Sequence, residues 1–246
     1  MTSSPTNPPV GLRRQFLKVG ERNLEVSQQA ILEAATEEFS LRGLEGARVD
    51  QIASKAGINK QLLYRYFGNK EDLYFRVLED AYCQIRESEK ALGLPSLEPR
   101  TAIRVFIASM VERIYRQPHF ARLVIDENFH EGQHLKHSSR VRALAAEILE
   151  IFEDVLARGV DSGDFRKGVD AVQLFTSIAS LSTFYVTNMH TLSVMFGERF
   201  KKLYKVPTMA AHIERVIFGF VLSDPTAYMR ELPARSARKR KPRSAD

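Results

Sequence analysis

Residues 48–74, RVDQIASKAGINKQLLYRYFGNKEDLY, constrain the fold of this chain more than any other stretch. Apolar residues recur at helical spacing from Val49 to Ala56, and Gly57 follows directly, where glycine permits the left-handed residue that ends a helix. Asn59 can then cap a second short helix over 60–66 by accepting a backbone N–H group. The pattern predicts two short helices joined by a tight turn, which is the arrangement that places a helix in the major groove of DNA.

The helix expected over 60–66 has one apolar side and one polar side. At 100° per residue, Leu63 and Phe67 fall together as the buried anchor. The other side carries amide, guanidinium, ammonium and phenol groups, which suit base edges and phosphates, although Gln61 and Arg65 could also be plain solvated surface. We expect DNA contacts from Arg48, Asn59, Lys60, Gln61, Leu62, Tyr64, Arg65, Tyr66 and Lys70.

The next helix begins after Gly68, with Asn69 placed to cap it and Lys70 as its first residue. A cation and free backbone N–H groups at a helix N-terminus can share one phosphate. Upstream, residues 27–42 carry an apolar stripe at helical spacing and end at Gly43. Together these segments predict a small helical DNA-binding domain.

Residues 27–82 resemble the DNA-binding domain of the TetR family of bacterial transcriptional regulators. The resemblance implies that helix 60–66 is the recognition helix, that Tyr64 touches the DNA backbone or a base, and that Lys70 holds a phosphate. Arg48 departs from the family pattern, which usually has a capping threonine or serine there; arginine cannot cap in that way, but its charge can pair with phosphate. The matching residues are Ile31, Ala34, Ala35, Phe39, Gly43, Val49, Ile52, Ala53, Ala56, Gly57, Leu63, Tyr64, Phe67, Lys70 and Leu73.

Beyond Tyr82 the expected helices become longer, and no strand pattern is found. We therefore expect an all-α protein with an N-terminal three-helix helix-turn-helix domain and a C-terminal helical bundle. The expected division is a flexible basic arm over 1–22, the DNA-binding domain with its connecting helix over 23–82, a ligand-binding and dimerisation domain over 92–224, and a basic disordered tail over 225–246. Helices are expected over 101–116, 120–129, 141–159, 170–190 and 210–223.

The second half resembles the effector domain of the same family in the phrases PHFARLVIDEN, GDFRKGVDAVQLF and STFYVTNMHTLSVMFG. These phrases are similar to a branch that includes regulators of aromatic-compound catabolism, which implies a small-molecule effector, with aromatic compounds as one class. An effector pocket is mostly apolar with a few polar groups, although each aromatic or methionine could equally be plain core. The candidates with this mixed character are Phe106, Met110, Glu127, His130, Phe175, Tyr185, Asn188, Met189 and His190.

A homodimer is expected because one helix-turn-helix reads only a few base pairs, so specificity needs two copies on the half-sites of a palindromic operator in double-stranded DNA. The helices over 170–190 and 210–223 carry more apolar surface than one face requires, and predict the interface between subunits. Ligand binding would favour a spacing of the DNA-binding domains that no longer fits the operator, with the helix from Lys70 to Glu89 as the lever. The expected interface residues are Phe184, Tyr185, Val186, Ile217, Phe218 and Phe220.

Residues 130–134, HEGQH, match the zinc-protease pattern H-E-x-x-H, which needs His130 and His134 on one helix face and Glu131 as general base. A zinc-dependent hydrolase is therefore the alternative function, with His137 as a further weak candidate ligand. However, Gly132 disfavours a helix and no third ligand has the expected spacing. We expect no metal, no other cofactor and no enzyme activity.

The formal net charge of +6 belongs to the two ends of the chain. Residues 230–246 hold seven Lys and Arg against two Asp and Glu, and residues 1–22 are also basic, so residues 23–229 are slightly acidic. The ends could contact DNA phosphates, or the C-terminal run could serve solubility alone. The single cysteine, Cys83, and the lack of a signal sequence or an apolar run of about 18 residues predict a cytoplasmic protein without a membrane partner.

Overall fold

The structure, a computed structural model, describes residues 19–231 of the 246-residue chain. Within these residues every regular element is a helix, apart from an isolated bridge between Phe165 and Leu222. This confirms the all-α prediction. None of the described helices is both long and apolar enough to span a bilayer. The expected basic arm and tail lie mostly outside the described residues.

The chain divides into two compact units, and the division falls within two helices, α5 and α8. Of the described residues, 19–87 and 117–145 form the first unit, and 88–116 and 146–231 form the second. The first unit holds α2 (Val19–Gly46), α3 (Val49–Lys55), α4 (Lys60–Phe67), most of α5 (Lys70–Lys90), α7 (Pro118–Phe129), the short η2 (Leu135–His137) and the start of α8 (Ser139–Asp161). The second holds the rest of α8, η1 (Leu94–Ser96), α6 (Pro99–Arg116), α9 (Ala171–Thr187), α10 (Met189–Leu203), α11 (Val206–Val221) and α12 (Pro225–Glu231).

The first unit is built around α2 and α5, whose rings Phe39 and Tyr74 meet edge to face with centroids 5.1 Å apart. The short helices α3 and α4 cannot be stable alone, and each is anchored by a fully buried side chain, Ile52 and Leu63 respectively. Leu123 of α7 is buried in the same core. Residues 117–145, expected in the domain 92–224, therefore pack in the first unit, because α7 lies against α2.

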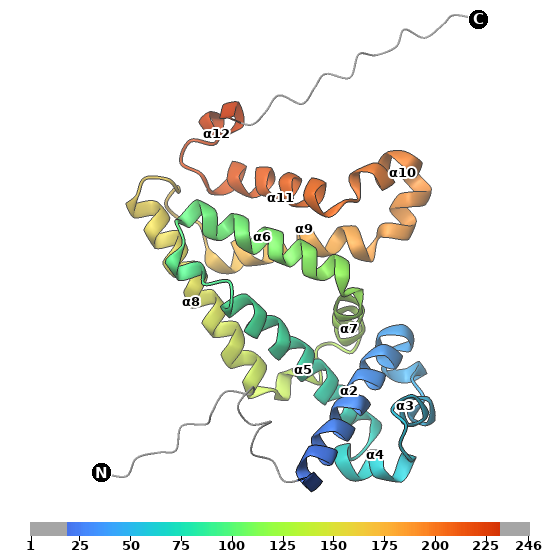
Figure 1. Cartoon of the computed structure of the whole chain (residues 1–246). Coiled ribbons are helices and arrows are strands. Elements are labelled where there is room, and N and C mark those ends of the chain that lie inside the picture. Colours follow the sequence, from blue (N-terminus) through green and yellow to red (C-terminus); the bar gives the residue numbers. More distant parts are fainter. Residues whose placement is uncertain (1–18, 232–246) are drawn as a thin grey trace, which may run out of the picture. The chain divides into compact units, whose positions relative to one another are not determined.

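In the second unit α6 packs against both α9 and α11, and the three helices lie side by side in Figure 1. Phe106 of α6, Phe152 of α8 and Phe175 of α9 meet at the centre of its core. The Phe106 and Phe152 rings are edge to face with centroids 4.8 Å apart. An apolar core of this kind is the main stabilising feature of a helical bundle.

Three expected boundaries differ from the structure. The helix expected over 170–190 ends at Thr187, because the Asn188 side chain donates to the backbone oxygen of Phe184 and competes with helix continuation. Residues 225–231, expected as part of a disordered tail, form α12, whose Tyr228 is buried edge to face on Phe218. In addition, α2 begins at Val19, inside the range expected for the arm.

Candidate nucleic-acid interface and effector region

The turn between α3 and α4 has the geometry that its sequence predicts. Gly57 has a φ of 68°, in the left-handed region, and Asn59 caps α4 by accepting the Leu62 N–H at 2.7 Å. Arg48 occupies the cap position of α3 and makes no side-chain capping hydrogen bond, as predicted. Its backbone N–H donates to Glu38 instead, at 3.2 Å.

The free face of α4 is polar and exposed. Gln61, Tyr64 and Arg65 are exposed, whereas Leu62 and Tyr66 are half-buried and Leu63 is buried. These side chains are placed so that they could reach base edges and phosphates if α4 entered a groove. The structure thus brings the candidate DNA-contacting residues of α4 onto one surface of the first unit.

Asp50 of α3 was not among the sequence candidates, although it lies directly beside this surface. Its carboxylate is 2.9 Å from the Lys60 ammonium, and the hydrogen bond between them raises the pKa of Lys60. The Lys60 ammonium also lies 5.8 Å from the centre of the Tyr64 ring. Asp50 therefore orients the first cation of α4 towards the ring of Tyr64.

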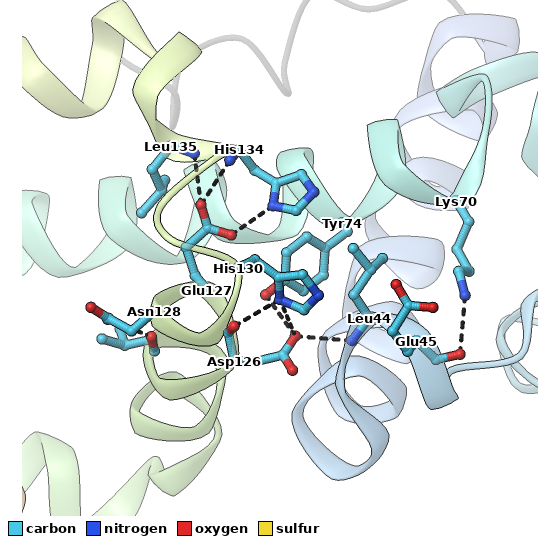
Figure 2. A network of polar contacts seen from close by, with 11 residues as sticks. Leu44, Glu45, Lys70, Tyr74, Asp126, Glu127, Asn128, His130, His134 and Leu135 are labelled. Carbon is cyan, nitrogen blue, oxygen red and sulfur yellow. Dashed lines mark hydrogen bonds and ion pairs between the residues drawn. The ribbon is translucent and has the colours of Figure 1, made fainter.

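Lys70 does not extend freely into solvent. Its ammonium donates to the backbone oxygen of Glu45 at 3.3 Å, which Figure 2 shows, and to that of Ala47 at 3.5 Å. These bonds link the start of α5 to the end of α2. An ammonium has three donors, so one remains for a phosphate. At the same helix start, Asn69 and Asp72 cap each other's backbone N–H groups.

Asp126 of α7 joins three segments of the first unit. Its Oδ2 atom accepts the Leu44 N–H at 2.9 Å and the Tyr74 hydroxyl at 2.8 Å, as Figure 2 shows. Burial and this hydrogen bond raise the pKa of Tyr74 well above its usual value. The approach is close because Gly43 has no side chain: a Cβ atom there would lie 2.5 Å from Asp126 Oδ1. Gly43 also has a positive φ of 68° within α2.

Glu127, the neighbour of Asp126, fixes the segment that follows α7. Its carboxylate is 2% exposed and accepts the backbone N–H groups of His134 and Leu135, each at 2.9 Å. It also bonds the His134 ring at 2.7 Å (Figure 2). Glu127 and His130 were expected in the effector pocket, but they belong to the first unit and hold its own backbone. This could not be predicted, because helical spacing does not show which unit α7 joins.

Residues 130–134 do not form the helix that a zinc-protease site requires. His130 is the residue that ends α7, and Glu131 and Gly132 follow with positive φ values of 56° and 68°. His130 and His134 therefore do not share a helix face, and His134 is engaged by Glu127. Among the described residues, no group of three or more His, Cys, Asp and Glu side chains is arranged to hold a metal ion.

The other effector candidates lie in the second unit, in two groups. Phe106 and Phe175 lie against the ring of Phe152, and Met110 is buried in the same core. Phe152 was not a candidate, although its helical spacing from Ile148 and Val155 could have indicated it. The second group is an aromatic row in which Tyr185 stacks on Phe200 with centroids 6.3 Å apart, and Phe200 stacks on Tyr204.

Asn188, Met189 and His190 lie at the junction of α9 and α10, where His190 is exposed and Asn188 bonds its own helix end. Asn188 and His190 therefore do not lie within the single helix expected over 170–190. The chain turns here, and a residue at a helix end has solvent and free backbone groups as partners.

One surface of α9 and α11 is hollowed and apolar. Val172 and Phe184 of α9 and Val216 and Phe220 of α11 are exposed; we call these four residues the α9–α11 face. A groove of about 720 Å³ is lined by three of these residues, Val172, Val216 and Phe220, and by small residues of α9 such as Thr176 and Ser180. Of the expected interface residues, Ile217 and Phe218 point inward and are buried in the core of the unit.

A capped helix-turn-helix with a polar recognition face, joined to a separate helical unit, defines a DNA-binding regulator with an effector domain. Two family descriptions match the chain: bacterial regulatory proteins of the tetR family over residues 31–77, and the tetracyclin repressor-like C-terminal domain over residues 99–217. The chain is 36% identical over 181 residues to the HTH-type transcriptional repressor NicS of Pseudomonas putida, covering 73% of this chain and 85% of NicS.

The fold is also that of solved structures. The putative transcriptional regulator SCO4942 from Streptomyces coelicolor aligns with a TM-score of 0.58 at 22% identity, over 79% of this chain and 98% of that one. The regulator FadR from Bacillus subtilis, solved with stearoyl-CoA, aligns with a TM-score of 0.57 at 18% identity, over 78% and 97%. The chain belongs to the TetR family, and it is a ligand-responsive, DNA-binding regulator of transcription.

Proposed function

We propose that the protein is a repressor that binds a palindromic operator as a homodimer and leaves it when a small-molecule effector binds. The observation that carries this proposal is the capped α3–turn–α4 unit, whose exposed face presents Gln61, Tyr64 and Arg65 together. Its relative NicS is a transcriptional repressor, which supports the direction of regulation.

On the DNA, we assign base contacts to Gln61 and phosphate contacts to Arg48 and Lys70. Asn59, Lys60, Leu62, Tyr64, Arg65 and Tyr66 complete the surface. Tyr64 has an exposed ring beside the Lys60 cation, which suits it to the sugar-phosphate backbone at the edge of the groove. The hydrogen bonds from Lys70 to the backbone oxygens of Glu45 and Ala47 support a contact with phosphate, because they hold the ammonium at the start of α5.

Footprinting on DNA flanking the protein's own gene tests the proposal, and the absence of a protected palindrome at moderate salt would refute it. On that site, Lys70→Ala should weaken binding of all sequences alike and reduce the salt slope by about one, whereas Gln61→Ala should cost about 1–3 kcal/mol and relax the preference at one position. Tyr64→Ala should weaken binding broadly. The matched control is Lys167→Ala, which removes an exposed lysine from the second unit.

The effector site is proposed in the second unit, among Phe106, Met110, Phe175 and Tyr185, with Met189 at its edge. These residues line an aromatic, mostly apolar region, which favours a mainly apolar effector with an aromatic ring or an acyl chain. The bound FadR structure shows that this fold can hold such a molecule. Thermal shift with a panel of aromatic acids and acyl thioesters tests the site, since a true effector must also lower operator affinity.

Signal transfer is proposed through α5, because this one helix contributes Tyr74 to the first unit and its last turn to the second. An effector can shift the equilibrium only by its differential affinity for the DNA-bound and free states. The homodimer is proposed to form through the α9–α11 face, because a two-fold interface uses the same patch of both subunits and this patch exposes four apolar side chains.

A further inference from the structure

Helix α10 carries an exposed apolar run that the second unit does not cover. Val194, Met195 and Phe196 are 87%, 68% and 55% exposed. Consecutive helical residues are about 100° apart, so three in a row span about 200° of the helix surface. A single packing face cannot bury such an arc, and an exposed apolar patch of this kind often marks an interaction site. We call these three residues the α10 tip.

The tip is separated from its anchor by a break in the helix. Of the residues of α10, Phe200 is the buried one, and it stacks between Tyr185 and Tyr204. Gly197 lies between tip and anchor with φ 55° and ψ −141°, a conformation that other residues rarely adopt. The residues before Gly197 are therefore directed away from the axis that Phe200 fixes. Figure 1 shows α10 at the point where the chain passes from α9 to α11.

The area of the α9–α11 face supports a role for the tip in association. A whole aromatic side chain buries about 150–250 Å², so the exposed parts of the four residues of this face come to roughly 300 Å². A stable interface buries about 800 Å² per partner, of which somewhat more than half is apolar. The face alone falls short of this area. The α10 tip adds a similar apolar area, on the helix that follows α9 in the chain.

We propose that the α10 tip is a docking arm that packs on a second copy of this chain and completes the interface begun by the α9–α11 face. The proposal rests on the homodimer proposed above. The partner is taken to be a second copy because the α9–α11 face alone falls short of the apolar area that a stable dimer buries. In a two-fold dimer each copy supplies one arm, so any change in the tip counts twice.

The test compares two variants of the full chain by sedimentation equilibrium over a dilution series. The triple substitution Val194→Ser, Met195→Ser and Phe196→Ser removes the tip, and Phe220→Ser changes the α9–α11 face. The triple variant should raise the dimer dissociation constant by roughly thirtyfold or more, because central apolar anchors dominate interfaces and both arms are lost. Leu41→Ser is the matched control, since it removes an exposed apolar side chain from the first unit and should leave the constant unchanged.

The two proposals fail in different ways. If Phe220→Ser weakens the dimer and the triple variant does not, the homodimer stands and the docking arm is overturned. If neither variant changes association, the interface itself is misplaced. A triple variant that dimerises normally but loses binding to anionic phospholipid vesicles would assign the tip to membranes and also overturn the proposal.

Cross-linking supplies a readout that does not depend on affinity. Met195→Cys in a Cys83→Ala background gives a single thiol for a benzophenone-maleimide label. Irradiation should then yield covalent dimers whose cross-linked peptides lie in α9, α10 or α11 of the second copy. The same label on Leu41→Cys, in the same background, should yield none. Cross-links from position 195 only within its own chain would overturn the docking arm.

Discussion

At the centre of the first unit, the adjacent carboxylates of Asp126 and Glu127 accept backbone N–H groups from Leu44, His134 and Leu135. The centre of the second unit is a cluster of three phenylalanine rings that pack against one another, namely Phe106, Phe152 and Phe175. Hydrogen bonds to a buried carboxylate are directional and fix one arrangement of backbone segments. Apolar packing depends on volume and tolerates conservative exchange.

This difference suits the two roles. A DNA-binding unit must hold α4 in one position, because a small displacement of the helix would move its side chains away from the base pairs they contact. An effector unit must admit a ligand, and a core of adaptable apolar contacts can repack around one. The contrast leads to predictions of different size for the two units.

The largest effect is expected in the second unit, from Phe152→Ala. Removing a buried ring leaves a cavity beside Phe106 and Phe175, and this costs about 3–5 kcal/mol of unfolding free energy. Phe152→Leu, which keeps most of the volume, should cost less than about 1.5 kcal/mol. Hydrogen exchange followed peptide by peptide measures this, with faster exchange in α6 and α9 and little change in α2. Phe129→Ala, at a ring that is 83% exposed, is the neutral control.

In the first unit, Asp126→Ala should cost about 2–3 kcal/mol, because it leaves the Leu44 N–H and the Tyr74 hydroxyl without their acceptor. Asp126→Asn should retain less of the lost stability than Phe152→Leu retains in the second unit. The asparagine keeps the shape of the side chain but loses the charge that strengthens both hydrogen bonds. Urea unfolding and exchange in α2 and α5 measure the loss.

The double variant Asp126→Ala with Tyr74→Phe separates the hydrogen bond from packing. Removing both partners leaves no unpaired hydroxyl, so the double variant should be more stable than the sum of the two single losses implies. If the losses of unfolding free energy in the two single variants simply add, the Asp126–Tyr74 hydrogen bond carries no specific energy. The proposed difference between a directional polar centre and an apolar one would then be contradicted.

The same contrast explains how much the sequence could predict. The helix-turn-helix was predicted almost to the residue, because Gly57 and Asn59 act locally and their effect needs no knowledge of the rest of the chain. The all-α class followed from the helical spacing of apolar residues. The sequence could not assign α7 to the first unit, because the contacts of Asp126 with Leu44 and Tyr74 join residues far apart in the chain.

In the second unit the same limit applied to packing. The structure buries Phe106 and Met110, which are both effector candidates, in the core of the unit. Helical spacing shows which residues face inward but not whether a ligand could enter between them, so their place in an effector site stays a prediction. The break at Asn188 was also missed, since an asparagine within an apolar run does not by itself predict where a helix ends.

A smaller effect is expected at the cap of α4. Asn59→Ala should cost about 1 kcal/mol, because the Leu62 N–H loses its acceptor, and Asn59→Asp should retain the cap. The loss is local but affects the helix that carries the proposed DNA contacts. Operator affinity should therefore fall more than global stability does, which parallel titrations and urea unfolding would show. Equal stability of the alanine and aspartate variants would contradict the capping role.

The smallest change should be a gain. Arg48 stands at the cap of α3 without a capping hydrogen bond, so Arg48→Ser supplies an acceptor and should stabilise the first unit by about 0.5–1 kcal/mol. Because the backbone N–H of Arg48 donates to Glu38, that hydrogen bond should survive the change.

If the arginine pairs with phosphate as proposed, the same variant should reduce the salt slope of operator binding by about one. Stability and DNA affinity would then move in opposite directions at one residue. A variant that gains stability with an unchanged salt slope would remove Arg48 from the DNA surface, whereas a loss of both would mean that its charge supports the fold of α3 itself.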